Sequence, residues 1–61
     1  MIKLTRMSGT VLLMNESFIA CAEETPDTVV TLQNGHQYFV KETVEEIYNK
    51  VLAFEKEKKA E

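Results

Sequence analysis

Two side chains belong to types that commonly carry chemistry, the lone His36 and the lone Cys21. A metal site needs three or four ligands, and no second histidine or acid stands at ligand spacing from His36. We therefore expect His36 to be a solvated residue at the start of a strand. A nucleophilic cysteine needs a base and a depressed pKa. Cys21 lies in an apolar run with no cation beside it, so we expect it to be a small, buried core residue.

Acidic residues gather around the single proline, where Glu23, Glu24 and Asp27 flank Pro26. Paired carboxylates do acid–base work only in a cleft that separates their pKa values, and a domain of this size has little room for one. We expect a solvated turn, with a partner-facing acidic patch as the alternative. Both glycines stand at expected turns, so no glycine-rich phosphate loop is formed. The sequence therefore predicts no enzyme, no cofactor, no metal and no small-molecule substrate.

The size and charge of the chain narrow the class further. Its 61 residues correspond to one domain, with seven Lys and Arg against ten Asp and Glu and a formal net charge of −3. This balance is unfavourable for binding to nucleic-acid phosphates. The longest apolar run has five residues, so we expect no membrane span. No charged-then-apolar leader follows Met1, which argues against export, and a single cysteine allows no intrachain disulfide.

Alternating and continuous apolar residues predict five strands in the first 40 residues. Ile2 and Leu4 alternate with polar residues in the first strand. The others are expected over residues 10–14, 18–23, 29–33 and 36–40. Because residues 11–14 are all apolar, we expect both faces of that strand to be covered.

Period-two alternation assigns Phe18, Ala20 and Ala22 to one face of the third strand, and Ile19 and Cys21 to the other. Turn residues separate the strands. Ser8-Gly9 allows a tight turn, and in the Pro26 turn the proline presets φ. Asn34-Gly35 predicts a type I′ hairpin turn, in which both residues have positive φ.

The period changes to that of a helix at Thr43. Thr43 and Glu46 match the capping box, in which each side chain bonds an amide of the first helical turn. An apolar stripe then predicts a helix from about Val44 to Phe54 or slightly beyond. Its members are Val44, Ile47, Tyr48, Val51, Leu52 and Phe54. We thus expect one domain over residues 1–54, mainly β with one C-terminal helix, and a charged, frayed tail over residues 55–61.

More apolar residues are present than one small core can hold. Consecutive pairs such as Phe18 and Ile19 must point to opposite faces of a sheet. The strands can close into a small barrel beneath the helix, and a subunit interface can cover the second face. We expect some of both. A chain this short buries only about 60% of its unfolded surface, so we expect a homo-oligomer.

Several motifs together resemble the small flagellar FlbD family, also called SwrD. They are Thr5-Arg6-Met7-Ser8-Gly9, Asn15, the stretch from Glu23 to Gly35 and the stretch from Val40 to Glu46. The likeness covers residues 1 to about 54. It departs from the family at Ser8, where Asn is usual, and at Ala22, where a larger aliphatic residue is usual.

The resemblance implies a bacterial cytoplasmic protein that is needed for full motility, has no catalytic activity and is associated with motor power, with the stator complex as a partner. Such a protein would act by binding another protein, peripherally at the inner membrane. Exposed turns and strand edges are the surfaces on which a small domain presents specific groups. The candidate interaction residues are Lys3, Thr5, Arg6, Glu24, Pro26 and Asp27.

Two other resemblances concern nucleic-acid binders. Residues 45–50 are similar to the last helix of the carbon-storage-regulator RNA binders, and the Asn-Gly hairpin before an acidic helix resembles LytTR-type DNA-binding domains. Both need a basic face. Residues 1–40 hold only Lys3 and Arg6 against four acidic residues, so a small RNA- or DNA-binding regulator is the alternative reading and protein binding the preferred one.

Overall fold

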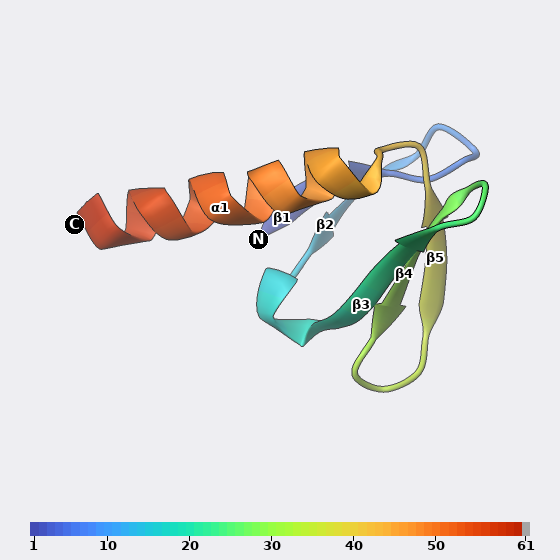
Figure 1. Cartoon of the computed structure of the whole chain (residues 1–61), viewed down its shortest axis with the longest axis horizontal. Helices are drawn as coiled ribbons and strands as arrows, with labels where there is room; N and C mark the ends of the chain where they lie inside the picture. Colours follow the sequence, from blue (N-terminus) through green and yellow to red (C-terminus); the bar gives the residue numbers. More distant parts are fainter. Residues whose placement is uncertain (61) are drawn as a thin grey trace.

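Five antiparallel strands and a C-terminal helix make up the chain, as the sequence predicts (Figure 1). The computed structural model describes the backbone of residues 1–60 and the side chains of residues 1–54. The elements are β1 (Ile2–Thr5), β2 (Val11–Met14), the 3₁₀ helix η1 (Glu16–Phe18), β3 (Ile19–Glu24), β4 (Thr28–Leu32), β5 (Gln37–Val40) and α1 (Val44–Ala60). The mainly β fold with one C-terminal helix is therefore confirmed.

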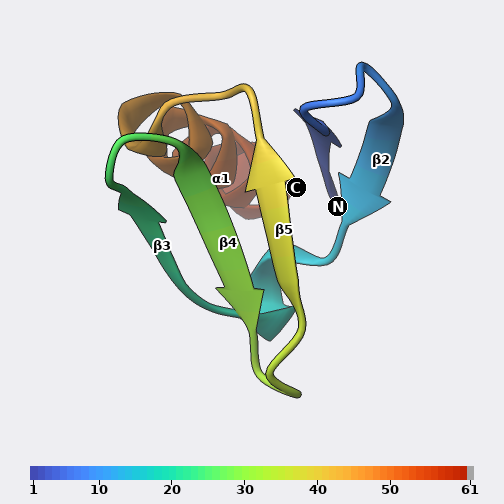
Figure 2. The ribbon, with the colours of Figure 1, turned by 90° about the vertical axis from the view of Figure 1, so that its right-hand side faces the viewer.

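The strands form two sheets that meet at one corner. β1 and β2 make a two-stranded sheet, and β3, β4 and β5 make a three-stranded sheet in that order. An antiparallel bridge between Arg6 and Val40 joins β1 to the end of β5. Beside it, the Lys41 N–H donates to the Thr5 carbonyl at 2.8 Å. The strands therefore follow one another as β2-β1-β5-β4-β3 around an open, barrel-like surface (Figure 2).

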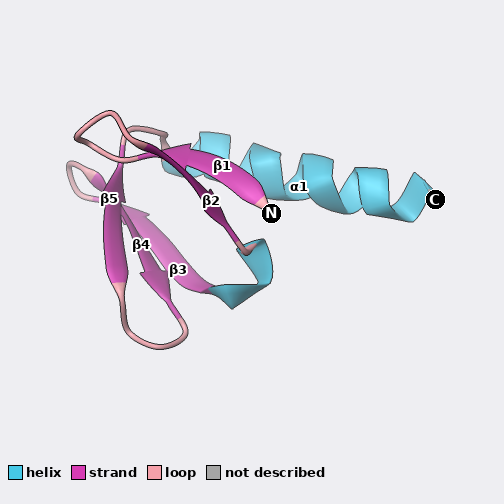
Figure 3. Cartoon of the chain, turned by 180° about the vertical axis from the view of Figure 1, so that it is seen from behind, coloured by secondary structure: helices cyan, strands magenta, loops and turns pink. Residues whose placement is uncertain are grey.

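The core lies between the concave side of this surface and the helix. Its buried apolar residues come from both sheets and from α1, and they are Ile2, Leu4, Met14, Val30, Val40 and Ile47. α1 packs against β1 and β3, one strand of each sheet, and so spans the gap between the sheets (Figure 3). Fully burying one such aliphatic side chain contributes about 1.5–3 kcal/mol, so these few residues supply most of the hydrophobic stabilisation.

The β1–β2 hairpin turns at Gly9. The Gly9 N–H donates to the Arg6 carbonyl at 2.8 Å, and the Arg6 N–H donates to the Thr10 carbonyl at 2.8 Å. Gly9 has a φ of 101°, which favours glycine. The bonds define a type I turn that is followed by a left-handed glycine, the usual three-residue hairpin loop.

The β4–β5 hairpin uses the same turn, which corrects the type I′ prediction. The Gly35 N–H donates to the Leu32 carbonyl at 2.9 Å, and the Leu32 N–H donates to the His36 carbonyl at 2.8 Å. Gly35 has a φ of 94°, whereas no non-glycine residue of the described chain has a positive φ. Asn34 instead accepts a hydrogen bond from the His36 N–H through Oδ1 at 3.1 Å. The extra loop residue, Gln33, accounts for the difference.

The face assignment in β3 is wrong because the strand carries a bulge. Its register with β4 shifts between Ile19 and Cys21. As a result Ile19 and Ala22 pack against the core while Ala20 and Cys21 are both exposed. The expected burial of Cys21 is therefore incorrect. Phe18 precedes the strand, in η1, and is also exposed.

The expected covering of both faces of β2 is also not found in the single chain. Leu12 and Met14 face inward, while Val11 and Leu13 are each 60% exposed. On that face their neighbours across the sheet are Thr5 and Lys3 of β1, and the two apolar side chains stay largely exposed.

α1 begins as predicted and buries a narrower stripe than predicted. The Thr43 N–H donates to Glu46 Oε1 at 2.8 Å, and the Glu46 N–H donates to Thr43 Oγ1 at 3.1 Å, which is the expected capping box. Tyr48 and Leu52 are 60% and 44% exposed, against expectation. Only β1 and β3 make substantial contact with the helix, so the outer part of the stripe has no partner.

The helix continues to Ala60, past the Phe54 end expected from its apolar stripe. The predicted fraying concerns residues 55–61. The side chains of these residues and the backbone of Glu61 lie outside the described part of the chain. The fraying stays a prediction.

We predict that Thr43→Ala lowers the free energy of unfolding by about 1 kcal/mol, the usual effect of removing an N-cap hydroxyl. Urea unfolding followed by circular dichroism measures it. Thr43→Ser is the matched control, because it keeps the hydroxyl that accepts from Glu46, and it should stay close to the parent chain. Equal unfolding midpoints for Thr43→Ala and the parent would contradict the assigned cap.

Candidate functional site

Three connections meet at one end of the molecule. The β1–β2 turn, the β3–β4 turn and the β5–α1 connection lie together at the top of Figure 2. They enclose a surface hollow of about 320 Å³, which is lined by Met7, Glu24, Pro26, Asp27, Thr28, Val40, Lys41 and Thr43. The hollow therefore contains three of the six predicted interaction residues, Glu24, Pro26 and Asp27.

The lining of the hollow combines buried, apolar and charged side chains. Val40 and Thr28 are buried, while the half-exposed Met7 offers a flexible apolar side chain. Asp27 and Lys41 are exposed and add one charge of each sign. No histidine or cysteine is among the lining residues, and no nucleophile is paired with a base there. The hollow can offer shallow apolar contact with charged margins.

Glu24 has a structural contact within this region. Its Oε1 accepts a hydrogen bond from the Val44 N–H at 3.1 Å, across 20 residues. Val44 is the first residue of α1, where backbone N–H groups lack helical partners and favour negative charge. Glu24 therefore ties the end of β3 to the start of the helix.

The remaining part of the turn presents its side chains outward. The Thr25–Pro26 peptide bond is cis, and the Thr25 N–H donates to the Asp27 carbonyl at 3.2 Å. Pro26 and Asp27 are exposed. Glu23, from the same acidic cluster, is exposed as well.

Thr5 and Arg6 lie where β1 meets β5 and not at a free strand edge. The Thr5 N–H and Oγ1 both donate to the Glu42 carboxylate at 2.9 Å, and the Thr5 carbonyl accepts from Lys41. The Arg6 guanidinium lies 5.4 Å from the centre of the Tyr38 ring, within cation–π range. β1 is thus an inner strand at this point.

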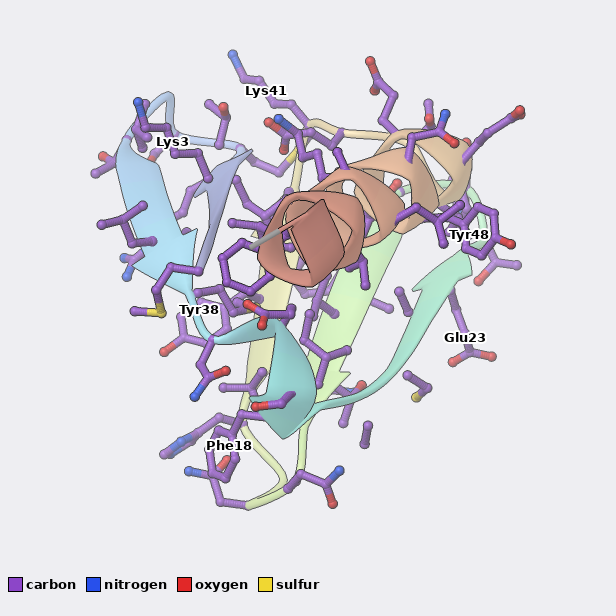
Figure 4. All side chains as sticks on the ribbon, turned by 90° about the vertical axis from the view of Figure 1, so that its left-hand side faces the viewer. Lys3, Phe18, Glu23, Tyr38, Lys41 and Tyr48 are labelled. Atoms are coloured by element: carbon purple, nitrogen blue, oxygen red, sulfur yellow. The ribbon has the colours of Figure 1, made fainter. Side chains whose placement is uncertain are left out.

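Lys3 borders a second hollow, away from the first. This hollow has a volume of about 280 Å³, lies between β1 and α1, and is lined by Met1, Ile2, Lys3, Lys50, Ala53 and Phe54. Figure 4 shows Lys3 on one flank of the molecule and Tyr48 on the opposite flank, with Lys41 and Phe18 at opposite ends. The six predicted residues therefore do not form one site.

The titration of the Glu42 carboxyl is clearly shifted. Burial raises its pKa, but the hydrogen bonds from Thr5, its own backbone N–H and the positive charge of Lys50 together outweigh this effect. The net result is a pKa below the ordinary value of 4.5. The carboxylate is therefore stabilised in its charged form, as expected for an acceptor of two hydrogen bonds.

Other candidate chemistry is not assembled in the described part of the chain. His36 and Cys21 are exposed and lie outside both hollows. No group of three or more His, Cys, Asp or Glu side chains among these residues is placed to hold a metal ion. No helix there is long and apolar enough to cross a membrane.

Sequence reasoning did not predict Met7 and Lys41, two exposed residues that line the hollow at the loop end. The sequence does hold a signal for Met7, since a large apolar residue in a turn lies away from the strands and helix that form the core. Lys41 gives no such signal, because its place depends on the corner at which β1 meets β5.

The chain folds as a small β domain with a surface hollow at the end where its three connections meet. The chain belongs to the FlbD family, described as flagellar and swarming motility proteins, whose model matches residues 1–58. This membership assigns the chain to flagellar and swarming motility. No curated protein and no solved structure matches the chain.

We predict that Glu42→Gln flattens the dependence of stability on pH below neutrality. Because the pKa of Glu42 is lowered on folding, its stabilising contribution is present above the ordinary pKa of 4.5 and is lost as the pH falls through the lowered value. Glutamine does not titrate, so the variant should be less stable at pH 7 and should approach the parent chain in acid. Unfolding free energies between pH 7 and about pH 3 test this. Parallel curves for the two proteins would contradict it.

We predict that Glu24→Lys destabilises the fold by about 1 kcal/mol or more, because it removes the acceptor of the Val44 N–H and puts a positive charge at the helix N-terminus. Glu23→Lys makes the same charge change one residue earlier, at an exposed position, and serves as the control. Thermal unfolding at low ionic strength measures both. Equal melting temperatures for the two variants would show that the Glu24–Val44 contact contributes nothing.

Proposed function

We propose that the chain is a non-enzymatic accessory protein of flagellar motility that acts by binding another protein. The observation that carries this proposal is the exposed hollow at the loop end, where Met7, Asp27 and Lys41 stand on a rigid scaffold. Loops held by a rigid scaffold are where binding residues concentrate. Family membership over residues 1–58 supplies the pathway.

The proposed partner is the stator complex of the flagellar motor. The resemblance to proteins associated with motor power favours it over other parts of the flagellum. A partner of this kind places the chain in the cytoplasm, peripheral to the motor at the inner membrane. The binding segment should be apolar enough to contact Met7 and should carry charge that complements Asp27 or Lys41.

Self-association is a further part of the proposal. Val11 and Leu13 are each 60% exposed in the single chain, and such contiguous apolar surface commonly marks an interface. A homo-oligomer would cover these residues without using the hollow.

Asp27→Lys should reduce motility to the level of a deletion strain, because it reverses the charge at the mouth of the hollow while leaving the Glu24–Val44 contact intact. The test complements a deletion strain and measures swarming, and it also measures the torque of single motors under bead load. Glu23→Lys again matches the charge change at an exposed site that does not line the hollow, and it should restore motility.

Three results would count against the proposal. Normal swarming with folded Asp27→Lys would remove the hollow as the contact surface. Normal motor torque in a deletion strain that fails to swarm would remove the stator as the partner. A deletion strain that moves normally under viscous load would remove the role in motility.

A further inference from the structure

The strand order β2-β1-β5-β4-β3 ends at β2 and β3, whereas β1 and β5 meet at the corner through the Arg6–Val40 bridge. The two end strands differ in the protection of their outer edges. Within the described chain, each pairs with one neighbour only, β2 with β1 and β3 with β4. Natural sheets block free edges with charges, bulges or proline, because unpaired backbone groups there can pair with another chain. β3 has a bulge after Ile19 and carries Glu23 and Glu24. β2 is Val-Leu-Leu-Met, with no charge, no proline and no register shift in its pairing.

The hydrogen-bonding pattern identifies which residues face the open edge. Antiparallel partners alternate between hydrogen-bonded and non-hydrogen-bonded pairs. The Arg6 N–H bonds to the Thr10 carbonyl, so the next hydrogen-bonded pair along the register is Leu4 with Leu12. Val11 and Leu13 therefore direct their N–H and carbonyl groups away from β1. In Figure 2 no other segment lies beside that edge of β2.

The same two residues expose their side chains. Val11 and Leu13 are each 60% exposed, whereas their partners on the same face of β1 are the polar Thr5 and Lys3. A strand that adds to this edge would thus gain main-chain hydrogen bonds and cover two apolar side chains together.

We propose that β2 pairs in antiparallel register with β2 of a second copy, about a two-fold axis at Leu12. In this register Val11 of one copy lies opposite Leu13 of the other, and each pair exchanges both backbone hydrogen bonds. Val11 and Leu13 of each copy are then both hydrogen-bonded to β2 of the other copy. The contact is isologous, so it closes at a dimer and does not propagate.

Charge also favours a second copy at this edge. The chain carries a net charge of −3, but β2 is uncharged and brings no like charges together. The nearest cation on that face is Lys3, which in the dimer stands three strand spacings from its symmetry mate. At about 4.8 Å for each spacing, the two ammonium groups are more than a Debye length apart at physiological salt. An acidic or basic foreign strand would instead place its charges directly against Val11 and Leu13.

The dimer is expected to be weak and reversible. Pairing of two four-residue strands buries less than the roughly 800 Å² per partner that is usual for stable complexes. This inference rests on the proposed self-association, for which it specifies the interface, and it is independent of the proposed role in motility.

Sedimentation equilibrium of the purified chain from about 1 to 500 μM spans the range expected for such an interface. The mass should rise toward twice 7.0 kDa. The double variant Val11→Lys/Leu13→Lys should raise the dimer dissociation constant at least about tenfold, since it places like charges opposite each other across the edge. Phe39→Lys/Tyr48→Lys introduces two lysines at comparably exposed apolar positions elsewhere and should leave the constant unchanged.

Cross-linking tests the register. Val11→Cys and Leu13→Cys are made separately in a Cys21→Ser background and are oxidised alone or after mixing. Directly paired residues lie about 5.5 Å apart between Cα atoms, within disulfide range, so the mixture should cross-link much faster than either variant alone.

Different outcomes overturn different parts of the idea. A chain that stays monomeric at about 500 μM would exclude self-association altogether and leave the edge for a foreign strand. A dimer unaffected by lysines at positions 11 and 13 would leave self-association standing and exclude this edge. Cross-linking of either cysteine variant alone as fast as the mixture would exclude the two-fold register about Leu12.

Discussion

The short corner at which β1 meets the end of β5 holds the two sheets together. There Arg6 bridges Val40, Lys41 donates to the Thr5 carbonyl, and both donors of Thr5 bond to Glu42. These bonds lie within a few residues of one another and link segments about 37 positions apart. Leu4, from the two-stranded sheet, belongs to the same buried cluster as Val30 and Val40 from the three-stranded sheet. The polar contacts of this corner therefore join the two sheets that share this core.

The corner also determines where the loops gather. It brings the β1–β2 turn next to the β5–α1 connection, and Glu24 then attaches the third connection by bonding to Val44 at the helix N-terminus. The hollow is a consequence of these polar links, since each of its three walls is fixed to another. Residues that hold the site, such as Glu24, are therefore distinct from residues that the site can offer a partner, such as Asp27.

Predictions from local sequence patterns are confirmed where a feature depends on a single helix or strand and its flanking turns. The capping box at Thr43 and Glu46 needs only the first helical turn, and the five strands follow from apolar alternation between turn residues. The same reading identified the Pro26 turn as exposed. Pro26 and Asp27 of this turn line the hollow, because turns at strand ends lie on the surface.

Features that depend on residues far apart in the chain could not be predicted from the sequence. The Glu42–Thr5 contact joins residues 37 positions apart, and no spacing rule marks it. Cys21 was misplaced because one bulge shifts every later side chain of a strand to the other face. Tyr48 fits the apolar stripe of the helix, but the two sheets leave room for only part of that stripe.

The apolar residues on the outer side of β2 are not explained by the fold of one chain. On the inner side, Leu12 and Met14 already supply this strand's contribution to the core. On the outer side, β1 places Lys3 and Thr5 beside Leu13 and Val11, so polar residues are tolerated on this face. A strand with one buried face and one solvent-exposed face is expected to alternate apolar and polar residues, as β1 does. β2 does not alternate, and the free energy of the single chain gives no reason for it. The reason must lie in something that covers the outer face of β2, and an uncharged strand with an open edge is best covered by another strand.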